Sequence, residues 1–262
     1  MTEMTQAVVT SRDGSVLTVS LNRPEQHNAM NPAIMHELMR IFGELPARDD
    51  VRVVVLTGNG RSFCAGADLA FMRAAADYTF EQNVADGQAI FNLMMAVDSC
   101  PQPVVGRING AAIGGGAGLV SCCDIVVASE RATFAFSEAR LGIAPAVISP
   151  FVLSRIGPGH ARELFLTGER FDVRRAQAIG LVHHVAAESE LDAVVAERVT
   201  QLLQAAPGAQ AAIKELIRAV AHQPKADARE YTAETIAARR ASDEGREGMS
   251  AFLEKRKPRW QE

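Results

Sequence analysis

Two glycine-rich segments carry the residues best suited to chemistry in this 262-residue chain. They read CAGAD at residues 64–68 and GGG at residues 114–116, and each follows an apolar run typical of a buried strand. Because glycine leaves the main chain open, two such loops can aim N–H groups at one developing negative oxygen. One such donor stabilises the charge by about 3–4 kcal/mol. Taken singly, a glycine cluster is more often a turn or a packing site.

Several other kinds of site have no matching pattern. The chain lacks GxxxxGK[ST] and GxSxG, and residues 114–118 lack the downstream acidic residue of a dinucleotide-binding loop. The histidines and cysteines have no metal-ligand spacing, and neighbouring His183 and His184 would point to opposite faces of a strand. We therefore expect no metal site and no nicotinamide or flavin cofactor.

The bulk composition limits the partners. The formal net charge is −4, which argues against general binding to nucleic acid. The N-terminal segment is polar, and no run of 18 apolar residues predicts a membrane span. We expect a cytoplasmic protein with no nucleic-acid or membrane partner and with reduced thiols at Cys64, Cys100, Cys122 and Cys123. The apolar run around the last two predicts that they are buried.

The first half of the chain alternates predicted strands and helices. Strand patterns cover residues 16–21 and 51–56, begin again at residue 104 and recur at 125–128. A helix should start at Asn31-Pro32, with asparagine as the N-cap and proline at the first helical position, and residues 71–98 also favour helix. This alternation predicts an α/β core with largely parallel strands.

The last part of the chain has a different character. Helical apolar stripes occupy residues 190–206 and 208–222, and shorter helical patterns occupy 232–239 and 248–256. We therefore predict a core over residues 1–195 and a helical segment over 196–262. Amphipathic helices of this kind contact either another subunit or their own core.

Five segments, in order, resemble the enoyl-CoA hydratase/isomerase (crotonase) family: LNRPEQHNAM, VVVLTGNGRSFCAGADL, NGAAIGGGAGLVSCCDIVVASERATFAFSEARLGIAP, FLTGERFDVRRAQAIGLVHHV and AFLEKRKPRW. The resemblance implies a ClpP/crotonase-like spiral of ββα units with a C-terminal helical trimerisation segment. It also implies an acyl-CoA substrate that carries its own coenzyme A, no further cofactor, and a homotrimer or a hexamer built as a dimer of trimers.

The resemblance also implies catalytic residues. In the family, main-chain N–H groups at the positions of Ala65 and Gly115 bind the thioester oxygen as it gains enolate charge. Glu138 matches the second of two family glutamates, whereas Gly118 stands where the first would be. Three interpretations stay open: a hydratase with one carboxylate, a double-bond isomerase with one proton shuttle, and an inactive or differently reactive member.

The surroundings of Glu138 should tune this carboxyl group. We expect an apolar setting that raises its pKa, supplied by Phe134, Phe136 and Leu141. Arg140 could face the acyl end of a substrate, but a solvated surface position is the more common one for arginine.

Coenzyme A is expected to lie along the first glycine loop. The main chain from Ala65 to Leu69 should line the groove, with Ala67 near the adenine, while Asp68 caps the helix that begins near Leu69. Arg23 is placed either to bind the phosphates or to bond turn carbonyls. Phe252 and Lys255 match family contacts to coenzyme A that can come from a neighbouring subunit.

The finer resemblance is to a bacterial subgroup assigned to methylglutaconyl-CoA or carboxygeranoyl-CoA hydration. We therefore predict an enoyl-CoA hydratase, with a methylglutaconyl-CoA-type branched substrate and leucine breakdown as the suggested setting. The alternative is an enoyl-CoA isomerase that uses Glu138 alone. An RNA-binding or scaffold role is a rival from another class, and the acidic net charge gives it little support.

Overall fold

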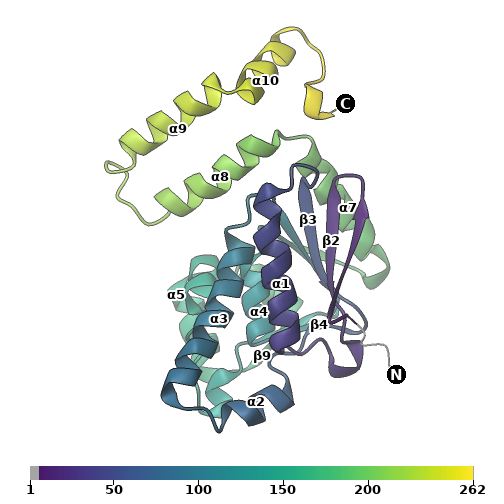
Figure 1. Ribbon diagram of the computed structural model, residues 1–262, viewed down its shortest axis with the longest axis vertical. Coiled ribbons are helices and arrows are strands. Elements are labelled where there is room, and N and C mark those ends of the chain that lie inside the picture. The colour runs from purple at the N-terminus through teal and green to yellow at the C-terminus, as the bar shows by residue number, and fades with distance from the viewer. Residues whose placement is uncertain (1–5, 262) are drawn as a thin grey trace.

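The computed structural model describes residues 6–261 and contains two β-sheets with helices packed around them (Figure 1). Within these residues the larger sheet has the order β1-β2-β3-β5-β7-β10, formed by β1 (Val8–Asp13), β2 (Val16–Leu21), β3 (Val53–Gly58), β5 (Val104–Ile108), β7 (Ile125–Ser129) and β10 (His184–Ala186). The smaller sheet has the order β4-β6-β8-β9, formed by β4 (Ser62–Cys64), β6 (Ala111–Ile113), β8 (Thr133–Ala135) and β9 (Arg170–Asp172). Neighbouring strands are parallel except in the pairs β1/β2 and β8/β9.

The chain builds these sheets as a spiral. Each turn adds one strand to the larger sheet and the next strand to the smaller one, in the pairs β3–β4, β5–β6 and β7–β8. Helices follow the second strand of each pair: α2 (Leu69–Ala75) and α3 (Phe80–Asp98), then α4 (Gly115–Cys122), then α5 (Ser149–Thr167). The predicted spiral of ββα units is confirmed.

The apolar patterns place the remaining core helices. α1 (Pro32–Glu44) begins where it was predicted, because the Asn31 side chain accepts a hydrogen bond from the Ile34 N–H at 2.9 Å. β3 is buried along its whole length, as a strand covered on both faces must be. α6 (Val173–Ala178) and α7 (Leu191–Leu203) follow β9 and β10.

The core extends further along the chain than the sequence suggested. Leu191, Val195 and Val199 of α7 form a buried apolar cluster with valines of the larger sheet, among them Val53 and Val105. The boundary expected near residue 195 therefore falls inside a core helix. Packing places the whole of α7 with the core, since its apolar stripe covers one face of the sheet.

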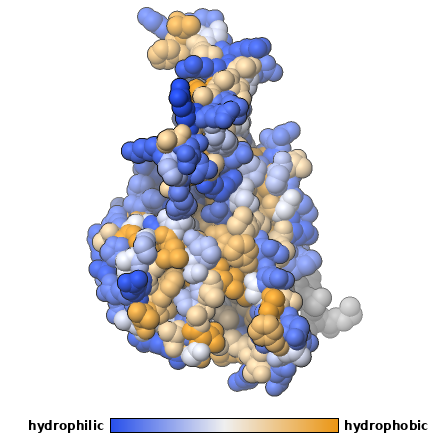
Figure 2. All heavy atoms as spheres, turned by 90° about the vertical axis from the view of Figure 1, so that its left-hand side faces the viewer, coloured by the Kyte–Doolittle hydropathy of each residue, from blue (hydrophilic) through white to orange (hydrophobic). Residues whose placement is uncertain are grey.

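The C-terminal helices extend away from this core (Figure 1). They are α8 (Pro207–Val220), α9 (Arg229–Ala241) and α10 (Asp243–Leu253), so the predicted helical segment is present. Figure 2 shows them as a projection on which apolar and hydrophilic side chains are mixed. Several large apolar side chains are exposed there: Ile213, Ile217, Ile236, Met249, Phe252 and Leu253.

No helix within residues 6–261 combines the length and the apolar character that crossing a lipid bilayer requires.

Candidate functional site

Three neighbouring parallel strands of the smaller sheet end side by side. Cys64 of β4 pairs with Ala112 of β6, and Ile113 of β6 pairs with Ala135 of β8. Because the carboxyl ends of parallel strands lie at the same edge of a sheet, the segments that follow these strands must meet there. The fold thus brings together the loops after β4 and β6 and, three residues after β8, Glu138.

The two glycine loops touch through positions where a side chain would not fit. A Cβ atom on Gly116 would lie 2.4 Å from the carbonyl oxygen of Cys64. A Cβ atom on Gly66, whose φ is +100°, would lie 3.3 Å from the carbonyl oxygen of Ile113. These glycines therefore allow the close backbone approach that the sequence suggested.

The first predicted main-chain donor is already occupied. The N–H of Ala65 donates a hydrogen bond to the carbonyl oxygen of His27 at 3.0 Å. A donor with an acceptor inside the fold cannot also serve a substrate without breaking that bond. The assignment of Ala65 is therefore corrected. The sequence could not show this, because His27 lies in a distant turn.

The free donor in this loop belongs to Ala67. Met30 pairs with the loop on both sides of that residue: its N–H donates to Gly66 at 2.7 Å, and its carbonyl accepts from the N–H of Asp68 at 2.9 Å. The N–H of Ala67, between them, has no acceptor within residues 6–261. Successive peptide groups point in alternating directions in extended backbone. Because the Gly66 carbonyl and the Asp68 N–H both face Met30, the Ala67 N–H between them faces away from Met30.

The second predicted donor is free. Gly115 is the first residue of α4, so its N–H has no intrahelical acceptor, and no other acceptor occurs in the described part of the chain. A Cβ atom on Gly115 would lie 3.5 Å from the methyl carbon of Met30, the residue that also pairs with the loop around Ala67. Met30 therefore contacts both of the loops that carry the amides of Ala67 and Gly115.

Glu138 points toward the second glycine loop. A Cβ atom on Gly114 would lie 3.3 Å from its Oε1 atom. Its Oε2 atom is buried and has no hydrogen-bond partner within residues 6–261. Burial raises the pKa of this carboxyl group. The expected direction of the shift is thus confirmed.

The predicted apolar neighbours of Glu138 differ in their exposure. Phe134 and Phe136 are fully buried, on β8 and just after it. Leu141 is instead 57% exposed, because it ends the short 3₁₀ turn that starts at Glu138. Leu141 is therefore not part of the buried core, and its place beside the Glu138 carboxyl group stays a prediction.

The position of the missing family glutamate is closed. A Cβ atom on Gly118 would lie 2.5 Å from Cγ2 of Ile148 and 3.2 Å from Cε of Met94. Both of these side chains are buried. Two apolar side chains thus occupy the space that a glutamate at position 118 would need.

Asp68 and Arg23 hold the first loop together. The Asp68 side chain caps α2, as predicted, by accepting hydrogen bonds from the N–H groups of Ala70 and Phe71. Arg23 forms an ion pair with Asp68 at 2.9 Å and donates to the carbonyl oxygen of Ala29 at 3.0 Å. The hydrogen bond from Arg23 lowers the pKa of Asp68. Arg23 thus makes the turn contact foreseen as one of its two roles.

Of the remaining predicted coenzyme A contacts, Leu69, Phe252 and Lys255 are exposed and Arg23 is half-buried. Leu69 is 72% exposed at the start of α2, and Arg23 lines a cavity of about 390 Å³. Phe252 is 83% exposed on α10, and Lys255 follows that helix with a φ of +56°. α10 lies at the opposite end of the molecule from β4 (Figure 1). One chain therefore does not bring Phe252 and Lys255 to the glycine loops.

Two other sequence interpretations can be placed. Arg140 is exposed and donates to the carbonyl oxygen of Thr167 at 3.0 Å, which supports the surface position. The part of the chain that the structure describes contains no cluster of three His, Cys, Asp or Glu residues suited to a metal ion. All four cysteines are free and buried, and burial raises the pKa of Cys64 to about 11.

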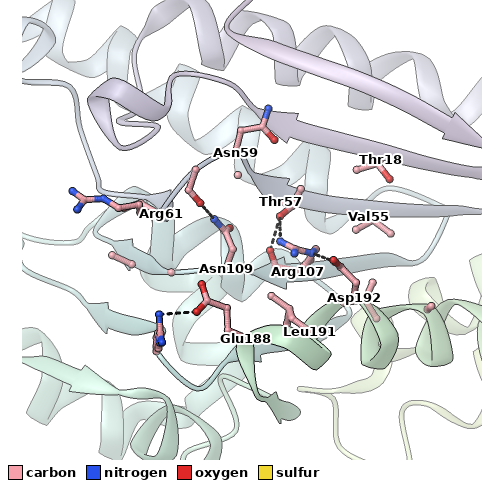
Figure 3. Close-up of a pocket in the computed structure, with 18 of the residues that line it drawn as sticks. Thr18, Val55, Thr57, Asn59, Arg61, Arg107, Asn109, Glu188, Leu191 and Asp192 are labelled. Atoms are coloured by element: carbon pink, nitrogen blue, oxygen red, sulfur yellow. Dashed lines mark hydrogen bonds and ion pairs between the residues drawn. The ribbon is translucent and has the colours of Figure 1, made fainter.

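A cavity of about 1070 Å³ lies elsewhere, between the larger sheet and α7 (Figure 3). None of the predicted site residues lines it. Arg107 there is held by Asp192 at 2.6 Å and lies beside Thr57, and Glu188 is paired with Arg131 at 2.6 Å. These charges are satisfied within the chain, so the cavity does not resemble the edge where Glu138 lies.

Comparison with known proteins agrees with this geometry. The sequence model of the enoyl-CoA hydratase/isomerase family matches residues 11–262. The short-chain-enoyl-CoA hydratase of Clostridium acetobutylicum is 32% identical over 95% of each chain, and the carnitinyl-CoA dehydratase of Escherichia coli is 34% identical over 98% of this chain and 99% of its own. The crystal structure of an enoyl-CoA hydratase from Shewanella pealeana superposes with a TM-score of 0.94 at 37% identity, covering 97% of this chain and 96% of its own. The chain belongs to the enoyl-CoA hydratase/isomerase family.

Proposed function

We propose that this protein is an enoyl-CoA hydratase that adds water reversibly, and on one face, to a 2-enoyl-CoA. The observation that supports this most is a pair of main-chain donors, Ala67 and Gly115, that have no acceptor within the described residues and lie on loops that meet beside Glu138. The buried Oε2 atom of Glu138 likewise has no partner there. Addition of water at Cβ moves negative charge onto the thioester oxygen. Fixed amide donors stabilise that charge more strongly in the transition state than in the ground state.

The proton transfers can be assigned to Glu138 in the simplest scheme. Its carboxylate takes a proton from water as the water oxygen bonds to Cβ, and the electrons of the double bond move toward the thioester. The same carboxyl group then returns the proton to Cα, which gives syn addition. A raised pKa suits this role, because a group that both accepts and donates works best near the ambient pH.

Coenzyme A binding completes the proposal. The main chain of residues 65–69 lines the ligand, with Arg23 close to its phosphates, and Phe252 and Lys255 reach it from a neighbouring subunit. The exposed position of α10, remote from β4, supports a contribution from another chain (Figure 1). We accordingly propose a homotrimer or a dimer of trimers, with no cofactor besides the coenzyme A of the substrate.

The decisive experiment measures loss of the absorbance of the conjugated thioester. The panel should contain straight-chain 2-enoyl-CoAs and methylglutaconyl-CoA, the substrate type suggested by the sequence. Glu138→Gln should lower kcat by about 10²-fold or more with the acyl-CoA affinity largely kept. Glu130→Gln, at an exposed residue, serves as the control. Equal rates for wild type and Glu138→Gln would refute the role of Glu138.

An isomerase is the second candidate, and the closed space at Gly118 favours it. A single carboxylate is sufficient to move a proton between two carbons of a 3-enoyl-CoA. Incubation of a 3-enoyl-CoA in heavy water would then give a deuterated 2-enoyl-CoA without water addition. Hydration of the 2-enoyl-CoA panel at a much higher rate would reject the isomerase.

A further inference from the structure

Residues 141–148 form an apolar run that is largely exposed. The run reads LGIAPAVI and contains no polar side chain. Residues 141–144 and 146 are exposed, and among them are the large side chains of Leu141 and Ile143. Consecutive exposed apolar residues are unfavourable in water and are typical of a surface that binds something. We therefore expect a bound group to cover this run.

The run starts in the same turn as the candidate carboxylate. Glu138 is the first residue and Leu141 the last residue of a short 3₁₀ turn. The chain then reverses at Gly142, whose φ is +75°, and the N–H of Ile143 donates to the carbonyl oxygen of Glu138 at 3.2 Å. Main-chain hydrogen bonds thus hold the start of the apolar run next to Glu138.

α3 carries a second row of exposed apolar side chains. Val84, Gly87 and Phe91 follow Phe80 at spacings of four, seven and eleven residues, so that the four share one helix face. Phe80, Val84 and Phe91 are all exposed. This face of α3 is therefore apolar but is not used to pack the core.

Two contacts place this face of α3 against the end of the apolar run and the start of α5. A Cβ atom on Gly87 would lie 3.7 Å from Cγ2 of Val147. The rings of Phe91 and Phe151 have centroids 5.4 Å apart. Both contacts join residues that are 60 positions apart in the chain, so α3 and residues 147–151 run in the same direction.

The shared direction shows which exposed residues lie together. Val84 and Phe80 precede Gly87 on the contacting face of α3, and Ile143 precedes Val147 on the run, so the exposed residues of both segments lie at the same end. Figure 2 shows apolar side chains on the side of the core that carries α3 and α5. We call this surface the apolar track, and its large exposed members are Phe80, Val84, Leu141 and Ile143.

We propose that the apolar track binds the distal part of a long acyl chain. The inference rests on the proposed hydratase function and names its substrate class. The sulfur and Cα are attached to opposite sides of the thioester carbonyl. With the carbonyl oxygen at the amides of Ala67 and Gly115 and coenzyme A along residues 65–69, the carbons beyond Cβ leave past Glu138 and meet the track.

The length of the track sets the length of the chain. From Gly87 back to Phe80 the helix extends about 10 Å, which an acyl chain of about ten carbons can cover and one of four carbons cannot reach along. A methylene group gains about four-fold in affinity when fully buried, so a chain covered on one side should gain about two-fold for each methylene. Longer substrates should therefore be favoured stepwise.

The kinetic test compares hydration of trans-2-butenoyl-CoA with hydration of trans-2-decenoyl-CoA. The additional methylenes should raise kcat/KM of wild type by at least about 10-fold. Ile143→Gln should lower kcat/KM for the ten-carbon substrate about 10-fold and leave the four-carbon substrate within about two-fold of wild type. Met39→Gln, at an exposed apolar residue of α1 outside the track, is the matched control and should change neither value.

Binding of saturated acyl-CoAs tests the track without the chemistry. In calorimetry, decanoyl-CoA should bind wild type at least about 10-fold more tightly than butyryl-CoA, and Val84→Gln should reduce this ratio. If wild type keeps the ratio but hydrates neither substrate, the track stands and the proposed hydratase function fails.

Three results would overturn the proposal. The first is equal binding of decanoyl-CoA and butyryl-CoA by wild type. The second is an Ile143→Gln variant that loses activity equally on both chain lengths, or on neither. The third is an Ile143→Gln variant that changes only the mass in sedimentation, because the surface would then be a contact between subunits.

Discussion

The edge of the smaller sheet where the two glycine loops and Glu138 meet, called the catalytic edge after its proposed role, and the C-terminal helices are built in opposite ways. At the catalytic edge, glycines allow close contact between backbone segments, and main-chain hydrogen bonds hold the loops in place. The C-terminal helices contact the core partly through polar groups, such as the 2.6 Å ion pair between Lys214 and Asp124, and leave apolar side chains in solvent. The two glycine loops and Glu138 of the first region all come from one chain. The second carries a surface that a single chain leaves uncovered.

This difference has a physical basis. Amide donors contribute most to catalysis when they are held in place before the reaction, so their loops need rigid support from the core. Uncovered apolar side chains on helices are typical of surfaces that associate. Substitutions should therefore act on stability and chemistry at the catalytic edge, but on docking and assembly in the C-terminal helices.

The largest loss of stability should follow Gly116→Ala. The new methyl group would lie 2.4 Å from the carbonyl oxygen of Cys64, and neither backbone segment can yield freely. We expect the free energy of unfolding to fall by about 3 kcal/mol and hydration to fall with it, measured by urea titration and by initial rates. Gly43→Ala in α1 meets open space and should instead stabilise by up to about 1 kcal/mol. Similar changes for both variants would mean that the loops are not closely packed.

Lys214→Met should have a smaller effect and should act on the C-terminal helices. The Lys214 ammonium group donates to Asp124 at 2.6 Å and to the carbonyl oxygen of Gln102 at 3.3 Å, and its side chain is only 10% exposed. Its loss should cost about 2 kcal/mol and increase hydrogen exchange in α8–α10. Protection of the sheet strands should stay as in wild type. Lys225→Met, at an exposed residue, is the control, and an equal response would show that the ion pair does not dock the helices.

Glu138→Gln should change stability in a manner that depends on pH. Burial raises the pKa of Glu138 in the folded state above the ordinary value of 4.5. The folded protein therefore holds this proton more tightly than the unfolded chain, and ionisation above the raised pKa destabilises the fold. The variant should have a higher Tm than wild type at pH 8 and the same Tm at pH 4. A lower Tm at pH 8 would show that the ionised carboxylate has a stabilising partner.

Ile217→Gln should have the smallest effect on the single chain. Its side chain is 58% exposed on α8, so we expect the free energy of unfolding to change by no more than about 0.5 kcal/mol. The assembly should respond instead, with a lower mass in sedimentation at micromolar concentration, because the exposed apolar side chains of α8 belong to the surface proposed to associate. Further exposed apolar residues of α8–α10 should be replaced in the same way. If the mass still does not change, the C-terminal helices do not carry an association surface, and the contrast between the two regions is wrong.

Much of the fold could be predicted because its signals are local. Asn31 and Pro32 predicted the start of α1, and the apolar runs at residues 16–21 and 125–128 predicted β2 and β7, since periodicity and capping depend on adjacent residues. The short strands of the smaller sheet, such as β4 and β9, were missed. Three residues carry too little periodicity to reveal a strand.

The candidate site likewise has features that local sequence predicts and features that depend on distant contacts. The sequence by itself indicated the family, the two glycine loops and the glutamate at position 138, because these are properties of residue type and order. Only the tertiary structure decided that the free amide is that of Ala67, that Ile148 closes the space at Gly118 and that α7 belongs to the core. Each of these depends on a residue that is distant in the chain. Whether a main-chain N–H is free, and whether a side chain has room, is decided by the groups that the fold places next to it and not by the local sequence.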